Sequence, residues 1–453
     1  MKYDLVIKNG CIVTSKSMKK MDIGIIDGKI YTLSKSIEDD VIVKKIDAEG
    51  MLVFPGGIDC HAHLNEPGYE WREDYNHGTK SAAAGGITTI IDMPLQNTPS
   101  LINKEAFYQK EEKINGKSYV DYGFWGGLVD NNLDEIEGMY EAGVFALKAF
   151  LSPASPDFPS SHIGMVYHAM KKAKDMNLLL GFHCEDYSMI SFNEAMAKNN
   201  GENSYRSYLD ARPVIAEEIA TQNILDMAKE TGARVHICHV SHPGVAKRIK
   251  KAIKEGVKVT AETCMHYLIY TEEDLIKNGG LFKCSPPLRK EESKEKLWDY
   301  VLDGTLSSIV SDHSPAAEYE KENDLTVWDT WGGISGLQTS FQIMYEYGVN
   351  RRGLSPCILA SRLSESAAEN FEIDGKGKIE IGYDADFIIF DPQKSWEITK
   401  DSLHYKNKIS SFCGLSGKGV VNMTILRGKI IYNEGEFSNI PKGQILKKIN
   451  KII

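Results

Sequence analysis

Two histidines lie two residues apart in the string DCHAH at positions 59–63. If this string ends a β-strand, His61 and His63 point to the same face, because side chains alternate between the two faces of a strand. Two imidazoles placed in this way can bind one divalent metal ion. The same pair also fits two ordinary polar residues of a loop, so it predicts a metal site only together with further ligands.

Lys148 is the second residue with unusual chemistry, because it interrupts the apolar string GVFALKAFL at positions 143–151. Burying an ammonium group costs free energy unless the group is paired or loses its proton. One interpretation is that the side chain reaches the strand end or pairs with a carboxylate. The other is that the neutral amine reacts with carbon dioxide to give a carbamate, whose two anionic oxygens can bridge two metal ions.

Three further potential ligands each follow a short apolar run. They are His183 in GFHCED, His239 in HICHVSH and Asp312 in IVSDHSP. Imidazole and carboxylate are ligands that suit zinc and other divalent transition metals. Four other histidines near these strings are interpreted as structural residues or as hydrogen-bond partners of the ligands: His236, His242, His266 and His313.

The elements that position these side chains alternate between short apolar runs and amphipathic stretches, a pattern typical of βαβ units. Eight strands are predicted, at 53–59, 87–93, 120–126, 144–151, 178–184, 234–240, 257–262 and 307–313. Eight such units in about 300 residues predict a (β/α)8 barrel, whose active sites lie at the carboxyl ends of the strands. The six candidate ligands should therefore converge. The alternative, an open doubly wound sheet, would favour a GxGxxG string after a strand, and none occurs.

The two ends of the chain have a different texture. Residues 1–52 contain short alternating strands and an Asp27-Gly28 hairpin signal, and residues 373–453 repeat the alternation. The chain is therefore divided into a β segment at 1–52, a barrel at 53–372 and a second β segment with a tail at 373–453. The lysine-rich end, residues 441–453, predicts an amphipathic terminal helix.

The composition favours a globular protein that acts on small molecules. Of the 453 residues, 42% are hydrophobic and 26% charged, and the formal net charge is −10. A net negative charge disfavours nucleic acid and anionic membranes as partners. No apolar run approaches the ~20 residues of a membrane-spanning helix, and the first residues lack the pattern of a secretory signal. The eight cysteines form no CxxC pair, so we expect free thiols and a cytoplasmic location.

Together, the strings DCHAHLNEPG, LKAF, HCED, HICHVS, ETCMHYL, KCSPPLR and SDHSP resemble those of the cyclic amidohydrolases, the family of dihydropyrimidinase, hydantoinase, allantoinase and dihydroorotase. The resemblance covers essentially the whole chain and implies that the two β segments join into a small β-sandwich beside the barrel. It implies a binuclear metal centre bridged by a hydroxide, with these ligands: His61, His63 and Asp312 for one ion, His183 and His239 for the other, and carboxylated Lys148 for both. Zinc suits this set, as do manganese, cobalt, nickel and iron.

Within the family, strings such as HLNEPG, YGFWGGLV and WGGISGLQ are most similar to those of the allantoinases, which implies hydrolysis of the hydantoin ring amide of allantoin to allantoate. Dihydroorotases have an arginine at the position of Asn65 that binds a substrate carboxylate. The amide of Asn65 favours an uncharged ring instead. Dihydropyrimidinases and hydantoinases usually have a tyrosine soon after the carboxylated lysine, and here AFLSPA follows Lys148. These enzymes remain the alternative, and a scaffold relative that has lost its ligands is a more distant one.

The resemblance also implies roles beyond metal binding. Asp312 would act as general acid and base, taking a proton from the attacking hydroxide and passing it to the ring nitrogen. Residues expected to contact the substrate are Asn65, Cys284, Ser285, Gly332 and Gly333. Relatives are commonly tetramers, so a homotetramer is expected.

Overall fold

The centre of the molecule is a barrel of eight parallel strands, which confirms the predicted fold class. The computed structural model describes residues 2–322 and 324–448, and the strands of its eight-stranded sheet follow one another in chain order. They are β8 (Gly57–Ala62), β9 (Ile87–Asp92), β10 (Asp121–Gly127), β11 (Ala146–Phe150), β12 (Leu179–His183), β13 (Val235–Ile237), β14 (Val259–Cys264) and β15 (Ser308–Val310). The two edges approach where the His63 amide donates to the His313 carbonyl oxygen at 2.8 Å.

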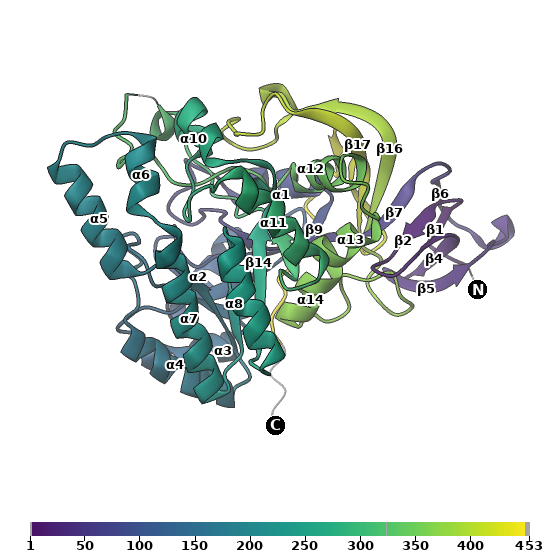
Figure 1. Cartoon of the computed structure of the whole chain (residues 1–453). Helices are drawn as coiled ribbons and strands as arrows, with labels where there is room; N and C mark the ends of the chain where they lie inside the picture. The colour runs from purple at the N-terminus through teal and green to yellow at the C-terminus, as the bar shows by residue number, and fades with distance from the viewer. Residues whose placement is uncertain (1, 323, 449–453) are drawn as a thin grey trace.

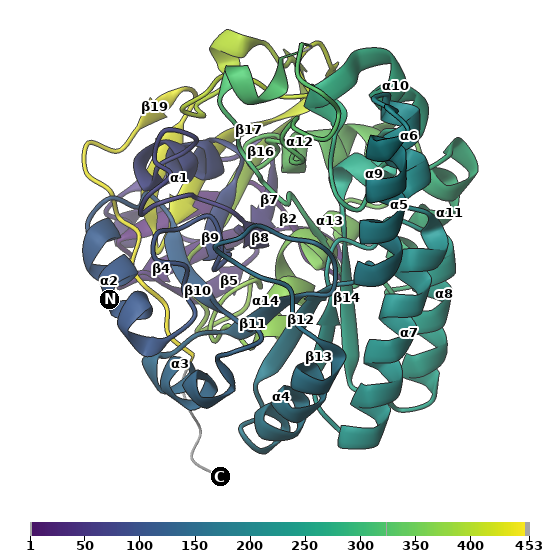
Figure 2. The same ribbon diagram turned by 90° about the vertical axis from the view of Figure 1, so that its left-hand side faces the viewer.

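Helices cover the outside of the barrel, and every connection between successive barrel strands contains at least one (Figure 2). In α8, for example, Val245, Ala246, Ile249 and Ala252 form the buried face, while most of the other positions are lysines and an arginine. The helices are α1 (Tyr75–Ala84), α2 (Lys104–Ile114), α3 (Ile136–Ala142), α4 (Ile163–Asp175), α5 (Tyr187–Asn199), α6 (Tyr205–Ala211), α7 (Val214–Thr231), α8 (Pro243–Lys254), α9 (Met265–Ile269), α10 (Glu272–Asn278), α11 (Glu291–Leu302), α12 (Ser340–Met344), α13 (Cys357–Ala360) and α14 (Ser366–Phe371).

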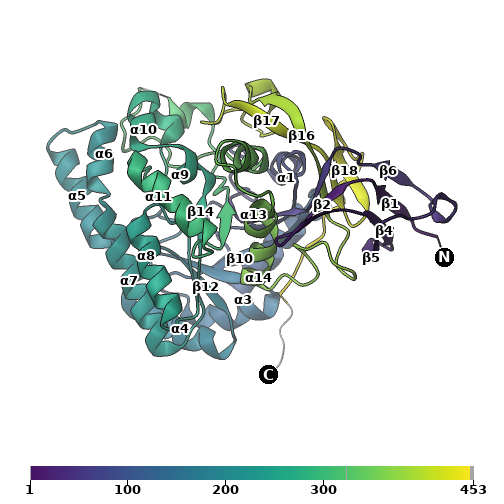
Figure 3. The ribbon, with the colours of Figure 1, turned by 45° about the vertical axis from the view of Figure 1, so that its right-hand side comes forward.

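Two smaller sheets form the β-sandwich beside the barrel (Figure 1). The seven-stranded sheet combines both ends of the chain: β2 (Cys11–Val13), β3 (Met18–Lys20) and β7 (Leu52–Pro55) with β16 (Phe387–Glu397), β17 (Ser416–Leu426), β18 (Lys429–Asn433) and β19 (Glu436–Phe437). The four-stranded sheet lies farther from the barrel (Figure 3) and contains β1 (Leu5–Lys8), β4 (Asp22–Ile26), β5 (Lys29–Ser34) and β6 (Lys45–Asp47). Asp27 and Gly28 join β4 to β5, both with positive φ, as the hairpin signal predicted.

The first predicted barrel strand, residues 53–59, is divided between two sheets. Its first half belongs to β7, which pairs with β16 and β2 in the sandwich, and its second half belongs to β8. Gly56 and Gly57 allow this crossing, because a Cβ on Gly56 would lie 2.2 Å from the Thr88 hydroxyl. A continuous apolar run gives no sign of a change of sheet. The division of the chain into domains at 52/53 and 372/373 stays a prediction.

The end of the chain is extended where the structure describes it, so a helix throughout 441–453 was a wrong expectation. Tyr122 of β10 donates to the Gln444 carbonyl oxygen at 3.0 Å and accepts from the Leu446 amide at 2.6 Å. These hydrogen bonds to the backbone of Tyr122 take the place of the hydrogen bonds that the tail would make within a helix. Residues 449–453 lie outside the described part. Among the described residues, no helix combines the length and apolar character needed to cross a membrane.

Candidate metal centre

The six predicted ligands come from strands that are far apart in sequence, and the barrel brings them together at the carboxyl ends of its strands. A cavity of about 410 Å³ opens there. Five of the six residues line it, and Lys148 in the middle of β11 is fully buried. The five are His61, His63, His183, His239 and Asp312.

His61, His63 and Asp312 form one group. One oxygen of Asp312, Oδ1, lies 3.3 Å from His61 Nε2 and 3.4 Å from His63 Nε2. Burial alone would raise the pKa of Asp312, but the two histidines lower it below its ordinary value on balance. The carboxylate is therefore ionised, which is the form that binds metal ions. The ligand atoms of all three residues lie within 4.8 Å of one another, close enough to hold one ion.

His183 and His239 form the second group. His183 Nδ1 lies 3.0 Å from His239 Nε2. Burial, and next the charge of Lys148, lower the pKa of His239 well below its ordinary value, so the ring is neutral and able to bind a metal. His239 and Asp312 both have positive φ, 36° and 44°. Non-glycine residues adopt this backbone at a cost of about 1 kcal/mol or more, and such strain is concentrated at functional sites.

Lys148 interacts electrostatically with both groups. Its charge lowers the pKa of His61 in the first group and of His183 and His239 in the second. Its Nζ atom is buried without a hydrogen-bond partner, and no carboxylate of the described residues forms an ion pair with it. The ion pair that one interpretation of Lys148 required is therefore not seen. An orphaned buried amine among imidazoles fits a group that is completed by a ligand.

The donor set also has other unused atoms. His63 Nδ1 and His239 Nδ1 are buried without a hydrogen-bond partner among the described residues. Buried polar atoms are rarely left unpaired, because each costs about 1 to 3 kcal/mol. The Nε2 atoms of the two rings are the ones that face Asp312 and His183, so these Nδ1 atoms are not themselves the candidate metal-binding atoms.

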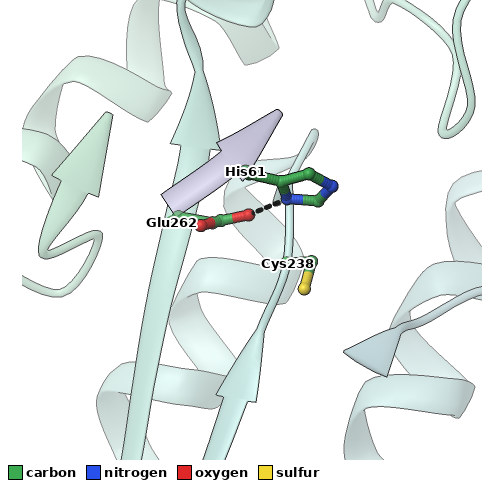
Figure 4. A group of neighbouring side chains, drawn as sticks. All are labelled: His61, Cys238 and Glu262. Carbon is green, nitrogen blue, oxygen red and sulfur yellow. Dashed lines mark hydrogen bonds and ion pairs between the residues drawn. The ribbon is translucent and has the colours of Figure 1, made fainter. Parts of the chain in front are cut away.

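Glu262 of β14 contacts the site, but it was not identified from the sequence. Its carboxylate hydrogen-bonds to His61 Nδ1 (Figure 4). The same carboxylate lies 3.1 Å from His236 Nε2. Burial would raise the pKa of Glu262, but the two histidines lower it on balance. The signal was a carboxylate at the end of the predicted strand 257–262. Cys238 lies beside the pair, and burial raises the pKa of its thiol to about 12, so it stays protonated.

The predicted substrate contacts lie in two different settings. Cys284, Ser285, Gly332 and Gly333 line the cavity. Asn65 is fully buried instead, and its amide donates to Gln96 Oε1 at 2.9 Å. The residue of this pair that lines the cavity is Gln96. Contact of Asn65 with a substrate stays a prediction.

Two further side chains of the cavity wall come from α6 and the residue after it. The Tyr208 hydroxyl donates to the Cys284 carbonyl oxygen at 2.8 Å and lies 2.7 Å from Ser285 Oγ. Arg212 is held by Glu185 at 2.5 Å and by Glu194 at 3.1 Å. The guanidinium charge in the cavity wall is thus compensated by two carboxylates. No spacing in the sequence linked these residues to the strand ends, because α6 lies in a long connection between β12 and β13.

A barrel of this kind with candidate metal ligands clustered at its strand ends is typical of metal-dependent hydrolases, and comparison with known proteins identifies the family. The model of the Amidohydrolase family matches residues 52–431, and the chain belongs to that family. The chain is 37% identical to an allantoinase of Deinococcus radiodurans, with 99% of each chain covered. It is also 37% identical to an allantoinase of Bacillus licheniformis, with 98% and 100% covered. An L-hydantoinase (dihydropyrimidinase) from Arthrobacter aurescens has a similar structure, with a TM-score of 0.95, 30% identity and 98% and 100% covered.

Proposed function

We propose that the protein is a metal-dependent cyclic amidase that hydrolyses the hydantoin ring amide of allantoin to give allantoate. The observation that carries this proposal is the gathering of five cavity-lining ligands around the buried amine of Lys148. The similarity to allantoinases over nearly the full length supports the choice of substrate.

The proposed cofactor is a pair of divalent ions, of which zinc suits the ligands best; manganese, cobalt, nickel or iron would also be accepted. Six residues would hold them: His61, His63, Asp312, His183, His239 and Lys148 after its carboxylation by carbon dioxide. When bound, the ions would lower the pKa of a water molecule to near neutrality and polarise the ring carbonyl. The unpaired, buried amine of Lys148 supports the carbamate, because its reaction with carbon dioxide would give two anionic oxygens that the ions could satisfy.

The reaction needs a group that moves a proton, and Asp312 is suited to this task. Its carboxylate lies at the cavity and is ionised, so it can accept the proton of the attacking hydroxide. The same carboxyl group then delivers that proton to the ring nitrogen as the C–N bond breaks. Glu262, Glu185 and the barrel backbone hold the histidines in place while this happens.

The cavity favours a neutral ring. Arg212 is the guanidinium in its wall, and the two carboxylates of Glu185 and Glu194 already compensate its charge. Lys283 also lines the cavity, and its Nζ atom donates to the carbonyl oxygens of Val327 and Thr330. The other wall groups include the backbone near Ser285 and Gly332 and the amide of Gln96. Amides and backbone groups can donate to and accept from a ureide, but they offer no charged fork for a substrate carboxylate.

The alternative is a dihydropyrimidinase or hydantoinase, which the similarity to the Arthrobacter aurescens structure favours. The test is to compare the purified protein's kcat/KM for allantoin, dihydrouracil and hydantoin. We expect allantoin to be the best substrate by a wide margin. Faster opening of dihydrouracil or hydantoin would leave the mechanism in place and replace the substrate. A protein inactive on all three rings after metal reconstitution would favour the scaffold alternative.

We also propose a homotetramer located in the cytoplasm. Exposed apolar side chains on α5, namely Tyr187, Phe192 and Met196, support association between copies. All eight cysteines are free, which supports a reducing compartment. Light scattering of the purified protein tests the first proposal: a mass of four chains is expected, and a monomer would contradict it.

A further inference from the structure

Two buried lysines contact the loop that carries the Gly332 side of the cavity. Lys321 ends the short helix η4 (Glu318–Lys321), and Lys283 follows the short helix η3 (Gly279–Phe282). Lys321 is 8% exposed and Lys283 is 6% exposed. Neither forms an ion pair with a carboxylate of the described residues. Neither lysine has a place in the proposed chemistry, so the reason for burying them lies elsewhere.

Lys321 connects two neighbouring segments of the cavity wall, the one that carries Gly332 and the one that leads to Ser285. Its Nζ atom donates to the carbonyl oxygens of Trp331 at 2.8 Å and Gly333 at 2.6 Å. The third donation, at 2.9 Å, goes to the carbonyl oxygen of Gly280 in η3, which leads to Cys284 and Ser285. All three protons of the ammonium are thus used on backbone oxygens.

Lys283 binds the same loop a few residues earlier. Its Nζ atom donates to the carbonyl oxygens of Val327 and Thr330, both at 2.6 Å. The two lysines therefore hold four carbonyl groups between residues 327 and 333. Burial lowers the pKa of each lysine to about 7, and the neighbouring charge of Arg212 adds to this for Lys283. Burial of two lysine side chains without carboxylate partners is costly, and their hydrogen bonds to the loop carbonyl oxygens offset part of this cost.

The bond to Trp331 fixes the direction of the next amide. The Trp331–Gly332 peptide is trans, so its N–H points opposite to the carbonyl oxygen that Lys321 holds. Gly332 lines the cavity, and its N–H has no hydrogen-bond partner among the described residues. A Cβ at this position would meet only Ser285 Oγ, at 3.6 Å. Gly332 thus has a free donor and open space at the cavity.

The ring and the amide of Trp331 in the same loop also have binding partners. The guanidinium of Arg72 lies 3.8 Å from the centroid of the Trp331 ring, and the Trp331 amide donates to the Glu320 carbonyl oxygen at 3.0 Å. Arg72 and Glu320 form an ion pair at 2.5 Å. Arg72 therefore contacts the Trp331 side chain, while Lys321 binds the Trp331 carbonyl oxygen.

We propose that Lys321, assisted by Lys283, is a positioning residue that directs the Gly332 amide toward the bound ring. Its three donations to carbonyl oxygens set the orientation of the loop, and the loop supplies the hydrogen bond to the substrate. This inference rests on the proposed function, because it assumes that a cyclic amide binds in the cavity.

The test compares Lys321→Met and Lys283→Met with Lys400→Met as the matched control. Lys400 pairs at 3.5 Å with Glu318 of the same η4, but both residues are 68% exposed. Metal content and Tm are measured first, then KM and kcat for allantoin, and then hydrogen exchange of the peptide containing residues 327–334. We expect Lys321→Met to raise KM about tenfold or more while kcat falls less, and exchange of this peptide to increase. Lys283→Met should change both in the same direction by a smaller factor, and Lys400→Met should change neither.

A purely structural role would lower Tm or the fraction of active protein and leave the KM of the folded fraction unchanged, and this result would overturn the inference. An equal rise of KM in the Lys400 variant would overturn it as well. If Lys321→Met does not fold, the test is made with folded Lys283→Met. An unchanged KM and unchanged hydrogen exchange in that variant would refute the positioning role of the two lysines. Failure of the proposed function is separate, since it shows as wild-type preference for another ring, and the same KM comparison is then made with that ring.

Discussion

Glu262 holds the Nδ1 atom of His61, and this directs the Nε2 atom of the same ring toward Asp312, 3.3 Å away. The two residues come from β14 and β8 and are about 200 positions apart in the chain. Because the carboxylate of Glu262 is ionised and accepts at Nδ1, the proton of the neutral ring stays on Nδ1 and Nε2 is free to bind a metal. The barrel thus sets the tautomer of this candidate ligand as well as its position.

Replacement of Glu262 by glutamine should therefore weaken metal binding without removing a ligand. A loss of roughly 10- to 100-fold in affinity is expected, because the amide can no longer hold the proton on Nδ1 as firmly. Zinc titration of the metal-free protein measures it, with Glu255→Gln on the exposed end of α8 as the control. Unchanged affinity in Glu262→Gln would show that the hydrogen bond does not tune the ligand.

Asp312→Asn should bind allantoin but hardly turn it over. The amide can still accept a hydrogen bond, but it cannot take up and return a proton, so kcat should fall by about 1,000-fold or more. Substrate binding is measured by equilibrium dialysis, and kcat by allantoate formation with the metal content matched. A kcat near that of the wild type would remove Asp312 from the proton transfer.

Lys148→Met should have opposite effects on stability and on activity. In the metal-free protein it removes a buried amino group without a hydrogen-bond partner, so we expect Tm to rise and the free energy of unfolding to increase by about 1 to 3 kcal/mol. The same variant should hold fewer than two metals and be inactive. Thermal unfolding and metal analysis of both forms test this. A lower Tm in the metal-free variant would show that Lys148 is satisfied without a metal.

Stability at acid pH should depend on His242. Its Nδ1 atom accepts from the Gly244 amide at 3.0 Å and caps α8. Burial, and next the charge of Arg289, lower the pKa of His242 from its ordinary value to about 4. Between pH ~6.5 and ~4 the unfolded chain binds this proton and the folded one does not, so stability falls with pH across this range.

His242→Asn keeps a capping oxygen that does not titrate in this range. With metal-free protein, the Tm of the wild type should therefore fall more steeply than that of His242→Asn as the pH drops from 7 to 4.5. Equal slopes for the two proteins would show that the proton on His242 does not oppose folding.

The barrel could be predicted from the sequence because each parallel strand is buried on both faces and therefore appears as a short apolar run. Seven of the eight runs coincide with barrel strands, and 53–59 does not because its Pro55-Gly56 turn moves the chain from one sheet to another. The extended tail was not predicted either. Its residues at 443–446 pair with β10, and such long-range pairing overrides local helix preference.

Site residues were predictable where a polar side chain stood at the end of an apolar run, as for His183 and Asp312. Those from connections were not: Tyr208 and Arg212 come from the long segment between β12 and β13 and reach the cavity only through the packing of α6. Gln96 was hidden because its contact with Asn65 joins two loops 31 residues apart.

Hydrolysis of allantoin by the purified protein, with metal content determined on the same sample and bicarbonate supplied, tests the central claim most directly. Our account predicts formation of allantoate by protein that contains about two divalent ions per chain. Removal of the ions by a chelator should abolish this activity, and metal with bicarbonate should restore it. A protein that binds no metal and opens no ring after such reconstitution would contradict the account.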